Sequence, residues 1–134
     1  MKAPEPSNQQ STYPPIPSET EGVAKIVLDS AFVVHSAMGP GLLESVYETC
    51  LAHEMRKMGL EVQTQVSLPV IYDDLRLDTG YRLDMLVDKK VIVEIKSVEQ
   101  LLPVHQAQLL TYLKLSGYRL VFLINFNVRH LRDG

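Results

Sequence analysis

Three charged residues, Asp84, Glu94 and Lys96, lie in two hydrophobic segments that otherwise have the pattern of buried strands. A charged stretch at residues 88–90 separates the two segments. Successive side chains of a strand point to opposite faces, so Glu94 and Lys96 share a face with Ile92. If residues 88–90 form a three-residue loop, the antiparallel register places Asp84 directly opposite Glu94.

Directly opposed side chains have Cβ atoms about 4.5–5.5 Å apart. Two carboxylates at that separation repel each other unless a positive charge lies between them. Mg²⁺ is bound in proteins through one or two carboxylates, so the spacing favours a metal site on Asp84 and Glu94 with the Lys96 ammonium beside it. The alternative is a solvated face on which Asp84 pairs with Arg82 or Lys96. Ile92 on the same face makes full solvation less favourable.

A second set of polar residues lies on the helix expected from Pro103 to about residue 115, because proline suits a first helical turn. His105, Gln108 and Tyr112 follow at helical spacing and form one polar stripe. Apolar residues spread over most of the remaining circumference, which predicts a helix covered on several sides. Buried polar groups need hydrogen-bond partners, so the stripe indicates either substrate binding in a cleft or bonds to loop carbonyls.

Two helices are expected before the strands, at residues 18–38 and 42–58, separated by "GPG" and ended by Gly59. Glu44 lies at the edge of the apolar stripe of the second helix. It is either a third carboxylate that reaches the cleft or a favourable charge in a helix's first turn. Glu54 lies nearer the middle of the same stripe, and no role is evident for it.

The hydrophobic period then changes from 3.6 to 2, which is typical of strands. Strands are expected at residues 62–72, 81–87, 91–95 and 118–126, with residues 73–80 as a hairpin connection or edge turn. Pro69 predicts an edge position for the first strand. Leu83, Met85 and Val87 are expected on the face opposite Asp84. The fold class is therefore α/β, a mixed β-sheet flanked by helices in the order α-α-β-β-β-α-β.

The whole chain has 134 residues, which suits one domain, and a formal net charge of −3. No global basic field attracts it to nucleic acid, and the small cluster of Arg129, His130 and Arg132 is by itself no strong indication of such binding. Cys50 is the only cysteine, which excludes an intrachain disulfide and fits a reducing compartment. Residues 1–20 are expected to be a disordered proline-rich tail before a domain at residues 21–134. No apolar run reaches membrane-spanning length, so a soluble cytoplasmic protein is expected.

Four motifs together resemble the small GxxExxY proteins, a family grouped with the PD-(D/E)xK nuclease superfamily. They are "GLLESVY" at residues 41–47, Asp84 followed by "EIK" at residues 94–96, "QLLTY" at residues 108–112 and "LINFN" at residues 123–127. "QLLTY" is similar to the Q-x-x-x-Y element of RecB-like nucleases. The resemblance covers residues 21–134, and four motifs in this order are more specific than any one of them.

The resemblance implies a restriction-endonuclease-like core with Mg²⁺ or Mn²⁺ bound by Asp84, Glu94 and the Ile95 carbonyl. Glu44 would contribute directly or through water. Asp84, Glu94 and Lys96 would be the catalytic residues, with Lys96 positioning water or stabilising developing charge. The polar stripe of His105, Gln108 and Tyr112 would bind the substrate backbone, or Gln108 and Tyr112 would orient Lys96.

Two hypotheses of function follow. The first is a metal-dependent nuclease that hydrolyses phosphodiester bonds in DNA. The alternative is a non-catalytic module that binds nucleic acid or protein and retains the nuclease fold, and a purely structural subunit is a further possibility. The acidic net charge favours protein binding or a structural role, since phosphate contacts normally dominate nucleic-acid affinity. The complete set of Asp84, Glu94 and Lys96 favours the nuclease. The partner expected is nucleic acid, with no membrane, and a homodimer is left open.

Overall fold

The computed structural model describes residues 16–134. The disordered tail expected at residues 1–20 lies, as far as residue 15, outside the described residues. Helix α2 (Ser18–Met38) already contains residues 18–20, and Thr20 is buried, so the boundary expected after residue 20 falls inside this helix.

Helix α3 (Glu44–Lys57) begins two residues later than the apolar pattern predicts. The chain before it is extended at Leu43, with ψ 150°, and turns at Gly41, which has φ +95°. That positive φ is easily reached only by glycine, and together these two conformations delay the first helical turn until Glu44.

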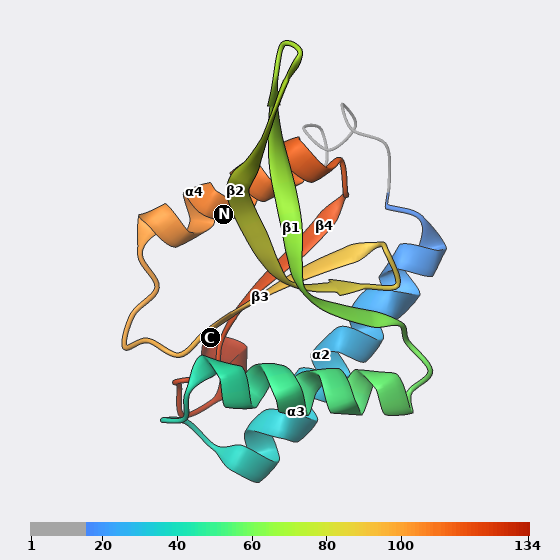
Figure 1. Ribbon diagram of the computed structural model, residues 1–134. Helices are drawn as coiled ribbons and strands as arrows, with labels where there is room; N and C mark the ends of the chain where they lie inside the picture. The colour runs from blue at the N-terminus through green and yellow to red at the C-terminus, as the bar shows by residue number, and fades with distance from the viewer. Residues whose placement is uncertain (1–15) are drawn as a thin grey trace, which may run out of the picture.

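The sheet contains four strands within residues 16–134, in the spatial order β1-β2-β3-β4. Their bounds are β1 (Val62–Tyr72), β2 (Leu75–Val87), β3 (Val91–Lys96) and β4 (Leu120–Asn125). The first three strands pair antiparallel, and β4 pairs parallel to β3 after a crossover through helix α4 (Pro103–Ser116). A short 3₁₀ helix, η1 (Leu131–Asp133), follows β4. The predicted mixed α/β fold and its element order are confirmed, and β1 is the predicted edge strand (Figure 1).

Strands β1 and β2 form a longer hairpin than the sequence predicts. Tyr72 pairs with Leu75, so residues 73–74 are the turn and most of the expected connection belongs to β2. The register shifts at Pro69, where the ladder loses a donor. The hairpin projects beyond the rest of the sheet (Figure 1).

The turn at residues 88–90 joins β2 to β3 in the predicted register, with Val87 opposite Val91. The Lys90 N–H closes the turn on the Val87 carbonyl at 2.9 Å. Asp88 and Lys89 both adopt positive φ, near +51° and +53°. An aspartate tolerates this conformation better than most residues, which fits its place at the start of the turn.

Two hydrophobic clusters hold the layers together. On one face of the sheet, Val93 and Ile95 pack with α2 and α3 through residues such as Val27 and Leu51. On the other face, Ile92 packs with Tyr112 of α4. Figure 1 shows α2 and α3 together on one side. No helix within residues 16–134 is both long and apolar enough to cross a membrane.

The prediction that α4 is covered on several sides is wrong. Val104 and Leu110 are 64% and 69% exposed, and Tyr112 is the buried residue of the helix. The polar stripe is turned inward at Tyr112, while several apolar side chains face outward. Leu113 and Leu115 pack inward beside Tyr112, so only part of the apolar surface of this helix is covered.

Candidate active site

Asp84 and Glu94 contact each other across β2 and β3. The Asp84 N–H donates to Glu94 Oε2 at 2.9 Å, and the Ile95 N–H donates to Asp84 Oδ2 at 2.8 Å. The regular ladder extends from Val87 to Met85 and stops before Asp84. Carboxylate oxygens of the facing strand therefore accept the two N–H groups that carbonyls would accept in a continued ladder.

The sheet is irregular on the other side of Asp84 as well. Gln65 of β1 lies between two residues paired with β2, opposite Asp84, and has φ +54°. The alternation of β2 side chains between the two faces of the sheet is broken at this point. Leu83 packs with Leu86 in the cluster under α4. The expectation that Leu83 shares a face with Met85 is wrong, and the interrupted pairing at Asp84 explains the change of face.

Both carboxyls resist ionisation in this environment. Burial, and then the negative charge of Asp84, raise the pKa of Glu94 from 4.5 to about 8, and Glu94 is only 5% exposed. Burial also raises the pKa of Asp84, against the opposing effects of the Ile95 N–H and the Lys96 charge. The pair therefore lacks sufficient positive charge and favours retention of a proton near neutral pH.

Lys96 lies on the strand next to both acids. Its charge lowers the pKa of Asp84 and of Glu94. The side chain is half-buried, and within residues 16–134 it forms no ion pair shorter than 4.0 Å. Its ammonium is thus close enough to act on the acids electrostatically while it remains available to another group.

Glu44 reaches the same region from the first turn of α3. Its Oε2 accepts the Ser97 N–H at 3.0 Å, and its charge contributes to the raised pKa of Asp84. The Ser97 hydroxyl donates to the Leu42 carbonyl at 2.6 Å, a second link between the start of α3 and the end of β3. Glu44 lies at the rim of the acidic pair and is exposed.

The other residues of "GLLESVY" account for how Glu44 is held. Tyr47 is completely buried and stacks on Phe126 with ring centroids 4.5 Å apart. Its hydroxyl donates to the Gly39 carbonyl and accepts the Leu42 N–H. Tyr47 therefore fixes the loop that leads into Glu44.

Helix α4 brings Tyr112 and Gln108 toward the acids. Tyr112 is 4% exposed and packs edge-on against Tyr81, with ring centroids 5.6 Å apart. Burial, followed by the charges of Glu94 and Asp84, raises the pKa of Tyr112 to about 12, while a hydrogen bond with Gln108 opposes the change. The Tyr112 hydroxyl therefore stays protonated and can donate a hydrogen bond at any physiological pH.

His105, the third member of the polar stripe, has a structural partner. The Nδ1 atom of its ring accepts the Leu102 N–H at 3.0 Å, and the backbone N–H of His105 donates to the Leu102 carbonyl. These bonds cap the start of α4. His105 and Gln108 also line a shallow pocket together with Tyr81, so capping leaves the residue beside the candidate substrate surface.

The sequence reasoning missed Glu48, Gln65 and Asn125. Glu48 lies one helical turn after Glu44, its carboxylate accepts a hydrogen bond from Gln65 at 3.0 Å, and burial raises its pKa. The i, i+4 spacing from Glu44 was the available signal for Glu48. The side chain of buried Asn125 binds both the N–H and the carbonyl of Val98 and so holds the chain that follows β3. This contact depends on the parallel pairing of Asn125 with Lys96, which the sequence does not show.

Glu54 forms an ion pair along the surface of α3. It accepts a hydrogen bond from Lys57 at 3.3 Å, three residues further along the helix. An exposed pair of this kind contributes little to stability. Glu54 therefore has no place in the acidic site.

The described residues contain no group of three Asp, Glu, His or Cys side chains that converge to hold a metal ion. The donor chemistry nevertheless fits Mg²⁺ or Mn²⁺, which need only one or two carboxylates from the protein. Half-buried Asp84 and buried Glu94 supply carboxylate oxygens whose ionisation needs a nearby positive charge. The Ile95 carbonyl points to the same side of β3 as its N–H, which binds Asp84.

Fold and site together define an α/β protein with paired acids and a lysine at an interruption of its mixed sheet. The sequence profile of the PD-(D/E)XK nuclease superfamily matches residues 21–134, and the chain belongs to this superfamily. Comparison with curated proteins and with solved structures found no match.

Proposed function

We propose that this protein is a metal-dependent nuclease that hydrolyses phosphodiester bonds in DNA, and that it belongs to the GxxExxY group of its superfamily. The observation that carries the proposal is the pair formed by buried Glu94 and half-buried Asp84. The two acids exchange hydrogen bonds with backbone N–H groups across β2 and β3, and Glu94 has a pKa of about 8. Such an uncompensated pair is costly in a fold that only needs stability.

Asp84, Glu94 and the Ile95 carbonyl would hold Mg²⁺ or Mn²⁺, with Glu44 contributing directly or through water. When bound, the ion would polarise a phosphoryl oxygen and lower the pKa of coordinated water. Lys96 would position the attacking water or stabilise the charge that develops on the phosphoryl oxygens. Support for this role comes from its proximity to both acids and from the absence of an ion pair to it within residues 16–134.

Helix α4 would bind the substrate backbone through its polar stripe. Gln108 lies close enough to Tyr112 to oppose the rise in the pKa of its hydroxyl. Tyr112 presents a permanently protonated hydroxyl near the acids, which suits a phosphate oxygen as acceptor. His105 would contribute at the rim from its capping position.

A binding module without catalysis is the second candidate. The net charge of −3 favours a module of this kind that binds protein, because phosphate contacts normally dominate nucleic-acid affinity. Such a module, whether it binds protein or nucleic acid, would leave DNA intact whatever metal is supplied.

Two substitutions separate the candidates. Asp84→Asn removes one charge with little change of shape and should weaken Mn²⁺ binding and abolish cleavage. Lys96→Ala should keep Mn²⁺ binding largely intact and still lower cleavage by about 10²-fold or more, the scale of a lost transition-state contact. Glu54→Gln is the control, because it removes a surface carboxylate from α3 outside the site.

The measurements are calorimetric titration with Mn²⁺ and Mg²⁺, and cleavage of plasmid, linear duplex and single-stranded DNA. Wild-type protein that binds neither metal and cuts none of these substrates would overturn the nuclease proposal. Cleavage that survives Asp84→Asn at the wild-type rate would assign the activity to another site or to a contaminant.

A further inference from the structure

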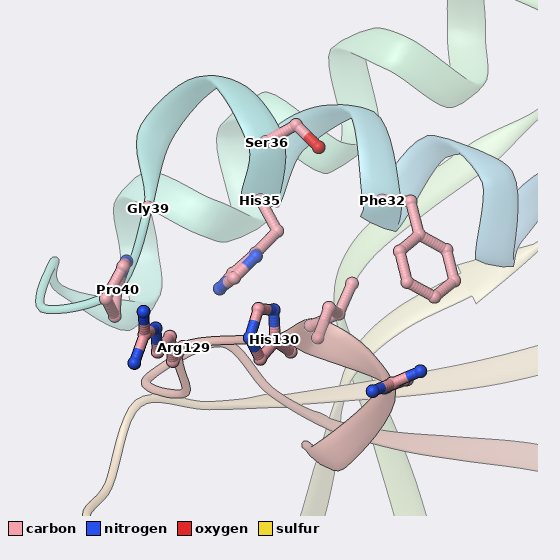
Figure 2. Close-up of a pocket in the computed structure, with 9 residues that line it drawn as sticks. Phe32, His35, Ser36, Gly39, Pro40, Arg129 and His130 are labelled. Atoms are coloured by element: carbon pink, nitrogen blue, oxygen red, sulfur yellow. The ribbon is translucent and has the colours of Figure 1, made fainter.

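A hollow of about 670 Å³ lies between the end of α2 and the segment after β4, outside the acidic site. Its lining includes Phe32, His35 and Pro40 on one side and Arg129, His130 and Arg132 on the other. Figure 2 shows the labelled histidines and Arg129 arranged around this hollow between helix and turn. We call it the arginine pocket.

The backbone that carries the arginines is held in place. The Val128 carbonyl contacts His35 Nε2 at 2.7 Å, and Leu131 is buried in the main core at 8% exposure. The side chains of Arg129 and Arg132 are exposed. A fixed turn that presents two guanidinium groups binds a ligand with less loss of entropy than a mobile one.

The charge of the arginine pocket contrasts with that of the molecule. None of its lining residues is acidic, although the net charge of the chain is −3. Within residues 16–134, neither Arg129 nor Arg132 forms an ion pair shorter than 4.0 Å. Arginine presents a planar fork of donors that matches phosphate oxygens, so a phosphate is the ligand class that this lining suits.

The arginine pocket lies at the same end of the sheet as the acidic site. Lys96 and Asn125 are paired neighbours on β3 and β4, and Arg129 follows four residues after Asn125. With at most about 3.6 Å per residue and about 4.8 Å between strands, the Cα atoms of Lys96 and Arg129 lie within about 20 Å of each other. A strand of nucleic acid advances about 3.4 Å per nucleotide, so a few nucleotides span this distance.

We propose that the arginine pocket binds a backbone phosphate of DNA a few nucleotides from the bond held at Asp84, Glu94 and Lys96. This inference rests on the proposed function for the identity of the ligand. It gives an acidic protein a local means of holding a polyanion, with Arg129 and Arg132 as the phosphate contacts and His130 beside them.

The test measures DNA binding without cleavage. A fluorescein-labelled 30-base-pair duplex is titrated with the full chain in EDTA, at several NaCl concentrations, and anisotropy is followed. The variant Arg129→Ala/Arg132→Ala should bind at least about tenfold more weakly at low salt, since each charged contact is worth about a factor of ten. Its plot of log affinity against log salt should be shallower by about one per arginine.

The control is Lys57→Ala/Arg76→Ala, which removes the same net charge from residues that already form ion pairs with Glu54 and Asp78. It should bind like the wild type. Equal weakening in both double variants, or no detectable binding of wild-type protein at low salt, would overturn the inference. Thermal unfolding of each variant establishes that the exposed substitutions leave the fold intact.

Cleavage in Mn²⁺ separates this inference from the proposed function. Cleavage by the wild type together with unchanged binding by Arg129→Ala/Arg132→Ala would refute the arginine pocket and leave the nuclease standing. Arginine-dependent binding without cleavage would support the arginine pocket and refute the nuclease. Preferential binding of an acidic peptide such as poly-glutamate over the duplex at equal salt would reassign the pocket to a protein partner.

Discussion

At the residue scale, Asp84 and Glu94 serve as acceptors in place of the backbone carbonyls of an interrupted ladder. Each bonds one carboxylate oxygen to an N–H of the facing strand. The arrangement gives both backbone N–H groups an acceptor, but it places two acidic side chains together where water is partly excluded. Its consequence is a Glu94 pKa of about 8.

The raised pKa of Glu94 predicts how the stability of the metal-free protein depends on pH. Below pH 4.5 Glu94 is protonated in both the folded and the unfolded chain, whereas from pH 4.5 to about 8 only the folded chain retains its proton. Unfolding then releases a proton, so the free energy of unfolding falls as pH rises through this window. The full effect is on the order of a few kcal/mol.

Glu94→Gln should remove this contribution, because glutamine keeps the acceptor for the Asp84 N–H and carries no charge. In urea unfolding with EDTA between pH 5 and pH 8, the variant should show a smaller loss of stability than the wild type and should be the more stable protein at pH 8. Glu54→Gln should follow the wild-type curve. Parallel curves for wild type and Glu94→Gln would show that Glu94 ionises in the fold near its ordinary pKa.

At the element scale, the loop between α2 and α3 positions Glu44. Gly41 supplies its positive φ, and the Tyr47 hydroxyl binds the Gly39 carbonyl and the Leu42 N–H. The "GLLESVY" motif therefore has a structural role in the loop as well as a chemical role through Glu44. Its glycine and tyrosine shape the loop, and its glutamate is held against Ser97.

Tyr47→Phe tests whether the Tyr47 hydroxyl stabilises this loop. The substitution keeps the ring stack on Phe126 and deletes one hydroxyl, which leaves a carbonyl and an N–H without partners. The free energy of unfolding should fall by about 1–3 kcal/mol, measured by urea denaturation. Tyr72→Phe, at a tyrosine that is 67% exposed on the hairpin, should change it by less than about 0.5 kcal/mol. Equal effects at the two positions would contradict the role assigned to the Tyr47 hydroxyl.

Helix α4 contributes the Tyr112 hydroxyl to the acidic site. A contact of this hydroxyl with the substrate can be tested separately. Tyr112→Phe preserves the packing on Tyr81, so Mn²⁺ affinity and thermal stability should change little. The rate of DNA cleavage should fall about tenfold, the effect of one hydrogen bond of about 1.4 kcal/mol made in the transition state. Tyr118→Phe alters a tyrosine packed at the edge of the same cluster and should cleave normally. A normal rate for Tyr112→Phe would exclude a substrate contact by its hydroxyl.

At the scale of the whole molecule, periodicity and turn chemistry predict the helices, the strands and the β2–β3 register. That register brings Asp84 toward Glu94, since an odd loop length decides which residues face each other, and the regular pairing stops one residue before them, at Met85. The irregular pairing at Gln65 and the role of Asn125 depend on contacts between strands distant in sequence. Periodicity also fails in part for α4, because tertiary packing buries Tyr112 of the polar stripe and leaves Val104 and Leu110 exposed.

The same long-range assembly explains why both acids ionise together only with a compensating charge. Asp84 and Glu94 come from neighbouring strands, Glu44 from α3, and Tyr112 from α4. Folding brings these elements together and buries the acids at the same time. A cation that binds the folded chain should therefore stabilise the whole molecule, since the unfolded chain does not present the pair.

Metal, proton and stability should be linked quantitatively in the wild type. At a free Mn²⁺ concentration of about 100 times the dissociation constant, the free energy of unfolding should rise by about 2.7 kcal/mol. At pH 7, below the Glu94 pKa of about 8, Glu94 is mostly protonated, so binding should release close to one proton. The release should fall toward zero at pH 9. Calorimetry in two buffers of different ionisation enthalpy measures this number directly.

The variants assign the linkage to named groups. Lys96→Ala should retain both the stabilisation and the proton release, because its ammonium is not a ligand. Glu94→Gln should bind more weakly and release no proton, and Asp84→Asn should lose most of the stabilisation. If Mn²⁺ instead stabilises Asp84→Asn as much as the wild type, or binds the wild type at pH 7 with no proton released, the ion occupies another part of the surface. The raised pKa of Glu94 would then reflect burial that serves no metal site.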